Sequence, residues 1–141
     1  MTRLSWLTSC CTAALLLFGA GATAKAERLD QRIREGAEVY NQGHCYACHG
    51  QFGSGTLGPR FSGDLNLKET SYVVTQILVG LGEMPAYAHR LSDDQIAAVA
   101  QYIRNSWGNA FGGVTPEDVA KAREMRRQAA RQTTAPSAAQ H

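Results

Sequence analysis

One five-residue segment limits what this chain can fold into more than any other feature. It runs Cys45-Tyr46-Ala47-Cys48-His49, a C-x-x-C-H pattern. Thiols three residues apart lie on one turn of a helix, and the next residue lies beside them. The segment therefore predicts a short helical turn that presents two sulfur atoms and one imidazole to the same bound group.

This pattern is that of covalent haem attachment, in which two thiols add to the haem and the histidine coordinates the iron. A thioredoxin-like redox pair follows a strand, and no strand pattern precedes Cys45. A zinc site needs a second pair of ligands, but Cys10 and Cys11 lie in an apolar N-terminal run. A plain disulfide between Cys45 and Cys48 remains an alternative to one haem c held through Cys45, Cys48 and His49.

The N-terminus has the three parts of a secretory signal. Arg3 supplies a positive start, an apolar stretch is strongest over residues 11–18, and Ala24-Lys25-Ala26 matches an Ala-x-Ala cleavage site. We expect a signal peptide over residues 1–26. Residues 4–24 carry no charge and form an anchor if left uncut, and Cys10 offers a weaker lipoprotein alternative. All three interpretations place the following domain outside the cytoplasm, with the periplasm as the expected location.

Apolar spacing after residue 26 predicts helices and no strands, hence an all-α protein. The helices are expected over residues 29–42, from 70 to 78, from Ser92 to Trp107 and from Thr115 onward, with a loop over 50–67. Ser92 and Gln95 are placed to form a capping box, and Pro116 is suited to a first helical position. We divide the chain into a haem domain over 27–113 and a C-terminal surface helix with a disordered tail over 114–141.

A haem iron held by His49 has a second axial position, and Met84 is the best candidate to fill it. It lies in Gly82-Glu83-Met84-Pro85 between two expected helices. A thioether is a soft ligand that raises the reduction potential. His89 is the rival ligand, and a purely structural methionine is the alternative.

Two further residues are candidates for supporting the haem. A ligating histidine usually donates its other ring N–H to a carbonyl group, and Pro59 could present one to His49. Arg60 is expected either to pair with a haem propionate or to remain a solvated surface arginine.

Charge narrows the range of partners only weakly. The chain has 14 basic and 12 acidic residues, which argues against a general affinity for nucleic acid or membrane surfaces. The expected C-terminal helix carries Lys121, Arg123, Arg126 and Arg127, which we interpret as a solvated face rather than a docking site for an acidic partner.

Taken together, the motifs resemble the class I bacterial c-type cytochromes over about residues 30–110. The matching features are Gly36, Tyr40, the attachment motif with Gly50, Gly58-Pro59, the segment from Gly82 to Tyr87, and Leu91 to Ile103. The resemblance implies three core helices around one covalent haem, with Gly36 and Tyr102 where the first and last core helices cross. It also implies His49 and Met84 as axial ligands.

The resemblance implies an electron carrier rather than an enzyme. Its expected partners are redox proteins, such as a dehydrogenase on one side and a terminal oxidase or reductase on the other. Two alternatives remain: a haem-bearing subunit fixed within a dehydrogenase or oxidase complex, and a haem enzyme or sensor with an open iron position. The exposed haem edge is expected near Tyr46, Ala47, Pro85, Ala86 and Tyr87.

Overall fold

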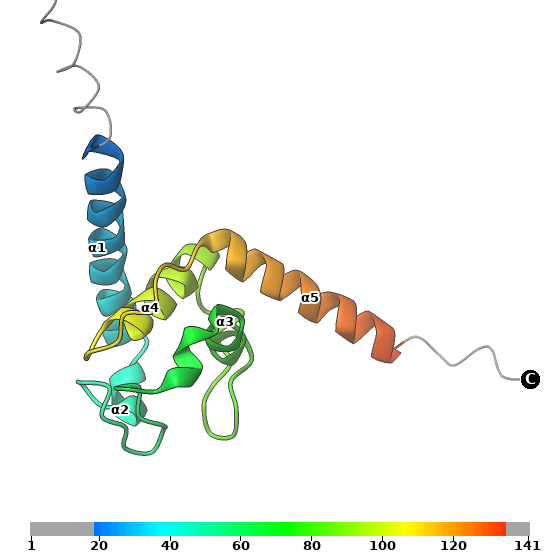
Figure 1. Ribbon diagram of the computed structural model, residues 1–141. Coiled ribbons are helices and arrows are strands. Elements are labelled where there is room, and N and C mark those ends of the chain that lie inside the picture. Colours follow the sequence, from blue (N-terminus) through cyan, green and yellow to red (C-terminus); the bar gives the residue numbers. More distant parts are fainter. Residues whose placement is uncertain (1–18, 135–141) are drawn as a thin grey trace, which may run out of the picture. The chain divides into compact units, whose positions relative to one another are not determined.

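The computed structural model describes residues 19–134 and contains helices and no strand within that range (Figure 1). The all-α prediction is therefore confirmed for the described residues. The helices are, in chain order, α1 (Gly19–Gln42), α2 (Cys45–His49), the 3-10 helix η1 (Leu65–Lys68), α3 (Thr70–Val79), α4 (Asp93–Asn105) and α5 (Pro116–Thr134). None of these helices is both long and apolar enough to cross a membrane.

The chain divides into two compact parts between Gln31 and Arg32. Residues 19–31, the described portion of the first part, form the first half of α1. The helix thus begins ten residues before the predicted start at Leu29, since the Ala-rich stretch before it favours helix without showing an apolar period. Most of the expected signal peptide, residues 1–18, lies outside the described residues.

Within the second part, α1 and α4 cross at a glycine. A Cβ atom added to Gly36 would overlap the carbonyl oxygen of Ala98 and come within 2.6 Å of the Tyr102 Cβ. Tyr40, one turn further along α1, packs its ring against Tyr102 with centroids 5.4 Å apart. The predicted crossing of Gly36 and Tyr102 is therefore present, and it depends on a residue without a side chain.

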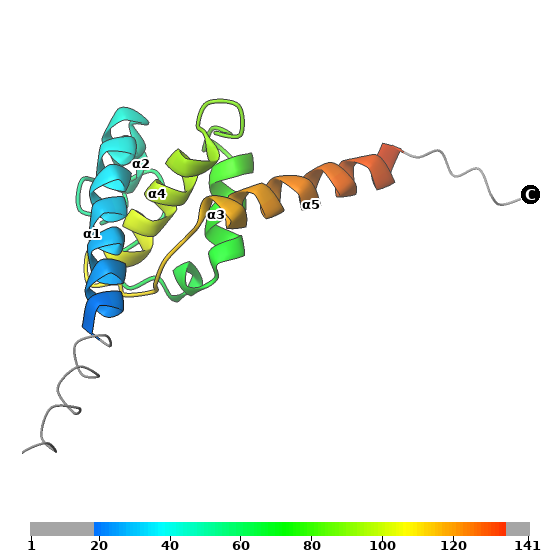
Figure 2. The same cartoon turned by 90° about the horizontal axis from the view of Figure 1, so that it is seen from above.

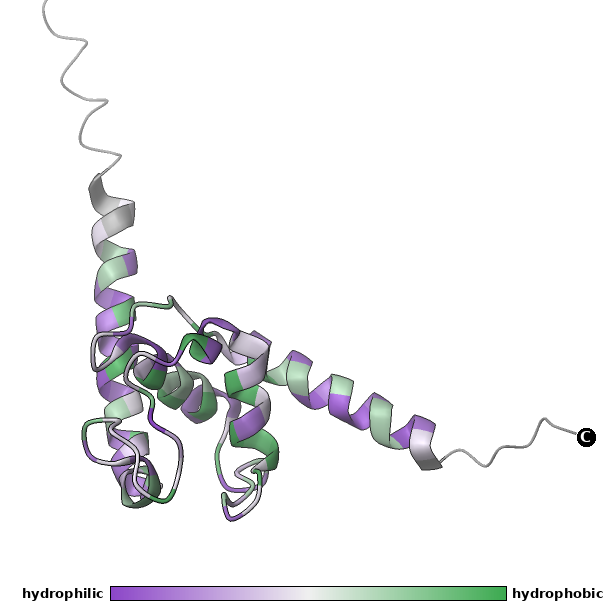
Figure 3. Ribbon diagram, turned by 60° about the horizontal axis from the view of Figure 1, so that its bottom comes forward, coloured by the Kyte–Doolittle hydropathy of each residue, from purple (hydrophilic) through white to green (hydrophobic). Residues whose placement is uncertain are grey.

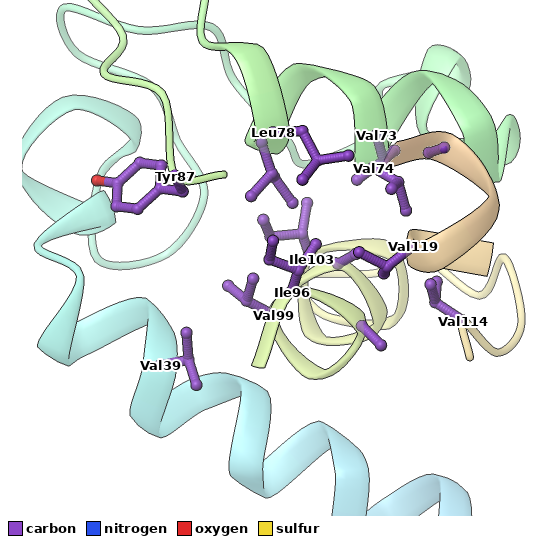
Figure 4. Close-up of a cluster of buried hydrophobic side chains, with 14 of the residues drawn as sticks. Val39, Val73, Val74, Leu78, Tyr87, Ile96, Val99, Ile103, Val114 and Val119 are labelled. Atoms are coloured by element: carbon purple, nitrogen blue, oxygen red, sulfur yellow. The ribbon is translucent and has the colours of Figure 1, made fainter. Parts of the chain in front are cut away.

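The hydrophobic core lies between α3, α4 and the start of α5. Leu78 of α3, Ile103 of α4 and Val119 of α5 point toward one another, and each is almost fully buried (Figure 4). Figure 2 shows the N-terminal end of α5 beside α3 and α4, with its later turns beyond them. We had expected a weakly packed surface helix, which is correct only for the second half of α5.

The exposed half of α5 differs from the buried half in composition. Val119 and Ala122 are buried, but from Met125, which is 48% exposed, to Thr133 every side chain is exposed. Figure 3 colours this stretch mostly purple or pale, whereas α3 carries strongly apolar segments. The last ten residues, 132–141, are expected to form the disordered tail, but the helix continues to Thr134, so the first three of them are helical. Residues 135–141 lie outside the described range.

The start of α4 matches the prediction and its end does not. The Ser92 hydroxyl accepts a hydrogen bond from the Gln95 N–H at 3.2 Å, and the Gln95 side chain accepts one from the Ser92 N–H at 2.9 Å. The helix ends at Asn105, two residues before Trp107, which has a left-handed φ of 55°. Trp107 leaves the helix because its ring packs beside Tyr40 and Tyr102 at centroid distances of 5.6 and 5.0 Å.

Candidate haem-attachment site

The attachment motif forms a helix of its own, α2. His44 precedes it in a left-handed conformation with φ 56°, which turns the chain sharply after α1. Cys45 and Cys48 then lie on one helical turn, both as free thiols and both half-exposed. His49 ends the helix and is only 6% exposed. The two sulfur atoms and the imidazole are thus held on one five-residue element that follows a helix, not a strand.

The loop after α2 closes back over the end of that helix. Thr56 Oγ1 donates to the carbonyl of Cys48 at 2.7 Å, and the N–H groups of Thr56 and Gly58 donate to the same oxygen at 3.0 and 2.9 Å. Gly55 N–H donates to the His49 carbonyl at 2.8 Å. These bonds satisfy carbonyls that a five-residue helix cannot satisfy internally, and they fix the loop against the histidine.

The His49 ring is held on two sides. Its Nδ1 lies 3.0 Å from the Pro59 carbonyl oxygen. A carbonyl only accepts hydrogen bonds, so this contact places a proton on Nδ1, and in the neutral tautomer that follows Nε2 has the lone pair that a metal needs. Phe61 stacks on the ring at a centroid distance of 4.2 Å. Gly58 also crowds it, because an added Cβ would lie 2.8 Å from Cε1.

The loop that carries Met84 runs from Gly80 to Leu91 and is tied to α3 at its base. The N–H groups of Tyr87 and Ala88 donate to the carbonyls of Ile77 and Leu78 at 3.1 and 3.2 Å. Met84 is half-buried and packs against the edge of the hydrophobic core. Its side chain is therefore neither fully buried, as an ordinary core methionine would be, nor free in solvent.

Tyr87 connects the Met84 loop to the cysteine segment. Its hydroxyl donates to the carbonyl of Gly43 at 2.9 Å, two residues before Cys45. Burial raises the pKa of the Tyr87 hydroxyl and also that of the Cys45 thiol. Tyr87 itself is buried, so it does not contribute to an exposed apolar edge as expected, whereas Tyr46, Ala47, Pro85 and Ala86 are exposed.

The remaining predicted residues lie on the surface. Arg60 is exposed, and its side chain makes no hydrogen bond or ion pair with the rest of residues 19–134. His89, the rival ligand, is exposed five residues beyond Met84, and His44 is exposed as well. Of the predicted site residues, the structure brings Pro59 into contact with His49 and leaves Arg60 in solvent.

The residues present fit a large apolar group with a metal at its centre. His49 offers Nε2 as a ligand atom, and Cys45 and Cys48 offer two free thiols beside it. Several large apolar side chains near these segments in sequence are solvent-exposed, Leu57 to 91% and Leu81 to 73%, with Leu65 and Tyr72 less so. Exposed apolar side chains in such number are surface that a porphyrin could cover.

Some supporting residues were not identified from the sequence. Phe61, which stacks on His49, is one of several apolar residues in the loop over 50–67, and its sequence context does not distinguish it from Phe52 and Leu57, which are exposed. Arg104 is buried in α4 and donates five hydrogen bonds to carbonyls of Leu67, Lys68, Phe111, Gly112 and Gly113. Arg104 lies four residues after Ala100 and eight after Ile96, so it shares their apolar face of the helix. That position was a signal that its side chain is not solvated. Burial lowers the pKa of this guanidinium.

Comparisons with known proteins show which family this chain is similar to. The family described as "Cytochrome C oxidase, cbb3-type, subunit III" matches residues 31–103, just over half of the chain. Cytochrome c-552 of Thermus thermophilus is 34% identical over 134 residues, covering 78% of this chain and 83% of that protein. Chloroplastic cytochrome c6 of Chlamydomonas reinhardtii is 36% identical over 100 residues, covering 65% of this chain and 64%, slightly under two thirds, of the algal protein.

A shorter match is to a cytochrome subunit of a dehydrogenase. The gluconate 2-dehydrogenase cytochrome c subunit of Pantoea cypripedii is 52% identical over 42 residues, which is 29% of this chain and 10% of that subunit. Identity is thus higher over a short segment of a much longer protein.

Proposed function

This chain belongs to the class I monohaem c-type cytochromes, and we propose that it carries single electrons between redox partners outside the cytoplasm. The family binds haem c covalently. The observation that supports the proposal most directly is the His49 ring, whose Nδ1 bonds to Pro59 and leaves Nε2 available beside two free thiols.

Each residue of the site has a distinct part in this proposal. Cys45 and Cys48 hold the haem through thioethers, and His49 is the proximal ligand whose orientation Pro59 and Phe61 fix. Met84, in the Gly80–Leu91 loop, would supply the second protein ligand to the iron. Arg60, solvent-exposed in this structure, pairs with a propionate. The haem iron supplies reversible one-electron chemistry.

If His49 and Met84 both ligate the iron, no position would be left for a substrate, which favours a carrier over an enzyme or a gas sensor. The apolar groups Tyr46, Ala47, Pro85 and Ala86 are exposed and suit a small, short-lived contact with a redox partner. We infer that these partners are a dehydrogenase as donor and a terminal oxidase or reductase as acceptor.

The full chain, expressed in a host with haem-attachment machinery, tests the proposal. We expect the mass to rise by one haem in the wild type, in Met84→Ala and in His89→Ala. The sulfur-to-iron absorption band of the oxidised protein should be lost only in Met84→Ala, since His89 is the rival ligand and serves as the matched control. A wild-type product without haem would refute the proposal.

Export is the second part of the proposal. We infer that residues 1–26 are removed as a signal peptide, so that the mature protein begins at Glu27 and carries its haem domain over 27–113 and a C-terminal extension over 114–141. The mass of the purified protein reports the cleavage site directly. A product that retains residues 1–26 and sediments with membranes would instead identify an uncut anchor.

A fixed subunit of a dehydrogenase complex is a second candidate. The match to the Pantoea cypripedii gluconate 2-dehydrogenase cytochrome c subunit favours it, as does 55% identity over 42 residues to the alcohol dehydrogenase (quinone) cytochrome c subunit of Gluconacetobacter polyoxogenes. Native mass spectrometry of the tagged protein purified from its own host separates the two. A free carrier appears alone, and a subunit appears with its dehydrogenase in fixed ratio.

A further inference from the structure

Arg123 of α5 binds the far side of the Met84 loop. Its guanidinium donates to the carbonyls of Ala88 and Leu91 at 2.5 and 3.0 Å. A third bond, of 2.6 Å, joins its Nε to Asp93 at the first turn of α4. The side chain of Arg123 is 20% exposed and that of Asp93 is 34% exposed, so the cluster is partly shielded from water.

Two of the three acceptors, the carbonyls of Ala88 and Leu91, belong to the return half of the loop. Ala88 lies four residues after Met84, and its N–H donates to the carbonyl of Leu78 in α3 at 3.2 Å. The peptide groups of Ala88 are therefore bonded to α3 through the N–H and to α5 through the carbonyl. Without Arg123, residues 88–91 would keep their hydrogen bonds to α3 and to Tyr87. They would lose their hydrogen bonds to α5.

We propose that Arg123 is a positioning residue that holds the Gly80–Leu91 loop closed, so that Met84 stays on the iron. The inference rests on the proposed function, in which Met84 is the axial ligand. α5 begins thirteen positions after residue 103, the last residue matched by the family. The C-terminal extension thereby acts on the loop that carries Met84.

An arginine is required because one planar guanidinium must reach three acceptors at once. Nε, Nη1 and Nη2 each serve a different oxygen. A lysine can keep the ion pair with Asp93 as a point charge, but it has no fixed fork to span two loop carbonyls. Arg127, one turn further on, bonds only to Glu124 of α5 itself, at 2.8 Å, and is the matched control.

A ligand competition measures how readily Met84 leaves the iron. Imidazole added to the oxidised holoprotein binds only molecules whose axial position is open, so its apparent Kd varies inversely with the open fraction. Hydrogen bonds to a charged group hold the loop, and their loss should enlarge that fraction. We expect the apparent Kd to fall by about tenfold in Arg123→Ala, by less in Arg123→Lys, and by less than about twofold in Arg127→Ala.

The outcomes separate this inference from the proposed function. A wild type without a sulfur-to-iron band would refute Met84 as the ligand. A wild type with that band and an unchanged imidazole Kd in both Arg123 variants would overturn the role of Arg123 alone. The role of Arg123 would also be overturned if Arg123→Ala lowered the free energy of unfolding but left the imidazole Kd unchanged. A change of the imidazole Kd in Arg127→Ala as large as that in Arg123→Ala would overturn it as well. Arg123→Lys keeps the charge and supplies the measurement if Arg123→Ala yields no holoprotein.

Discussion

The Tyr87 hydroxyl donates a hydrogen bond of 2.9 Å to the carbonyl oxygen of Gly43, across 44 positions of sequence. It is a direct link between the loop that carries Met84 and the segment that carries the two cysteines. The two sides of the proposed haem site are therefore joined by protein contacts that do not involve the haem. Tyr87 is buried and Gly43 is half-buried, so this link is partly shielded from competing water.

Replacing Tyr87 by phenylalanine should loosen that link while preserving the ring. We expect Tyr87→Phe to lower the free energy of unfolding of the holoprotein by about 1 kcal/mol, the usual net value of one hydrogen bond. Denaturant titration followed by circular dichroism measures it. Thr133→Val, which removes an exposed hydroxyl near the end of α5, is the control and should change little. Equal losses in both variants would contradict a specific role for the Tyr87 hydroxyl.

The crossing of α1 and α4 allows a second prediction. Alanine is favoured over glycine inside a helix by about 1 kcal/mol, but at Gly36 its Cβ would overlap the Ala98 carbonyl. The steric cost should prevail, so we expect Gly36→Ala to destabilise the protein by about 2 kcal/mol. Gly113→Ala is the matched control, because the nearest atom to its added Cβ is 3.5 Å away. A stabilised Gly36→Ala would show that the helices can separate at little cost.

Local interactions are the part of this fold that could be predicted from sequence. The Ser92–Gln95 capping box joins residues three apart, and the attachment motif spans five. The contact between His49 and Pro59 joins residues ten apart and was expected because a ligating histidine needs an acceptor. In the capping box and the attachment motif the residue types specify both partners, whereas Pro59 stood out by its rigid ring and not by its carbonyl.

The roles of two arginines could not be predicted in the same way. Arg104 and Arg123 bond to backbone carbonyls up to 37 positions away. Every residue has a carbonyl group, so such a partner leaves no mark in the sequence. We had interpreted Arg123 as a solvated charge, and that interpretation is wrong. Trp107 was predicted to lie in the helix for a related reason. Its packing against Tyr40 and Tyr102, which draws it out of the helix, cannot be read from the spacing of apolar residues.

Arg104 should be one of the most sensitive positions in α4. Its five carbonyl acceptors belong to η1 and to the segment before α5, and all would lose a charged donor together. We expect Arg104→Met, which keeps most of the side chain's length, to cost about 3 kcal/mol, the upper end for hydrogen bonds to a charged group. Arg126→Met on the exposed face of α5 is the control. A loss below about 1 kcal/mol would mean that water replaces the guanidinium.

The burial of Tyr40 leads to a prediction of how the free energy of unfolding depends on pH. It is fully buried, and its hydroxyl donates to the Gly50 carbonyl at 2.8 Å. Burial raises its pKa well above the ordinary 10.0, with a smaller effect of the Cys45 thiol. The folded state therefore favours the neutral phenol, so its contribution is complete below pH 10 and is lost as the pH rises from there toward the raised pKa.

Tyr40→Phe isolates this contribution. At neutral pH we expect the variant to be less stable by about 1–2 kcal/mol, because the Gly50 carbonyl loses its buried donor. Above about pH 10 the difference between wild type and variant should narrow, since only the wild type must keep Tyr40 protonated. Tyr87 and Tyr102, whose pKa values are also raised by burial, titrate in both proteins and cancel in the difference. A difference that stays constant up to about pH 11 would contradict the assignment.

Gly58 provides the sharpest test of how His49 is oriented. Its φ is not positive, so alanine brings no backbone strain, and the only consequence is a Cβ 2.8 Å from the imidazole Cε1. The ring must turn, which weakens its bond to Pro59. Because the partners that orient a metal-bound histidine affect function by 10–100-fold, we expect the yield of haem-loaded Gly58→Ala to fall by about tenfold and its reduction potential to shift. Gly113→Ala should match the wild type in both measurements, and a Gly58→Ala protein that also does so would show that the imidazole tolerates rotation.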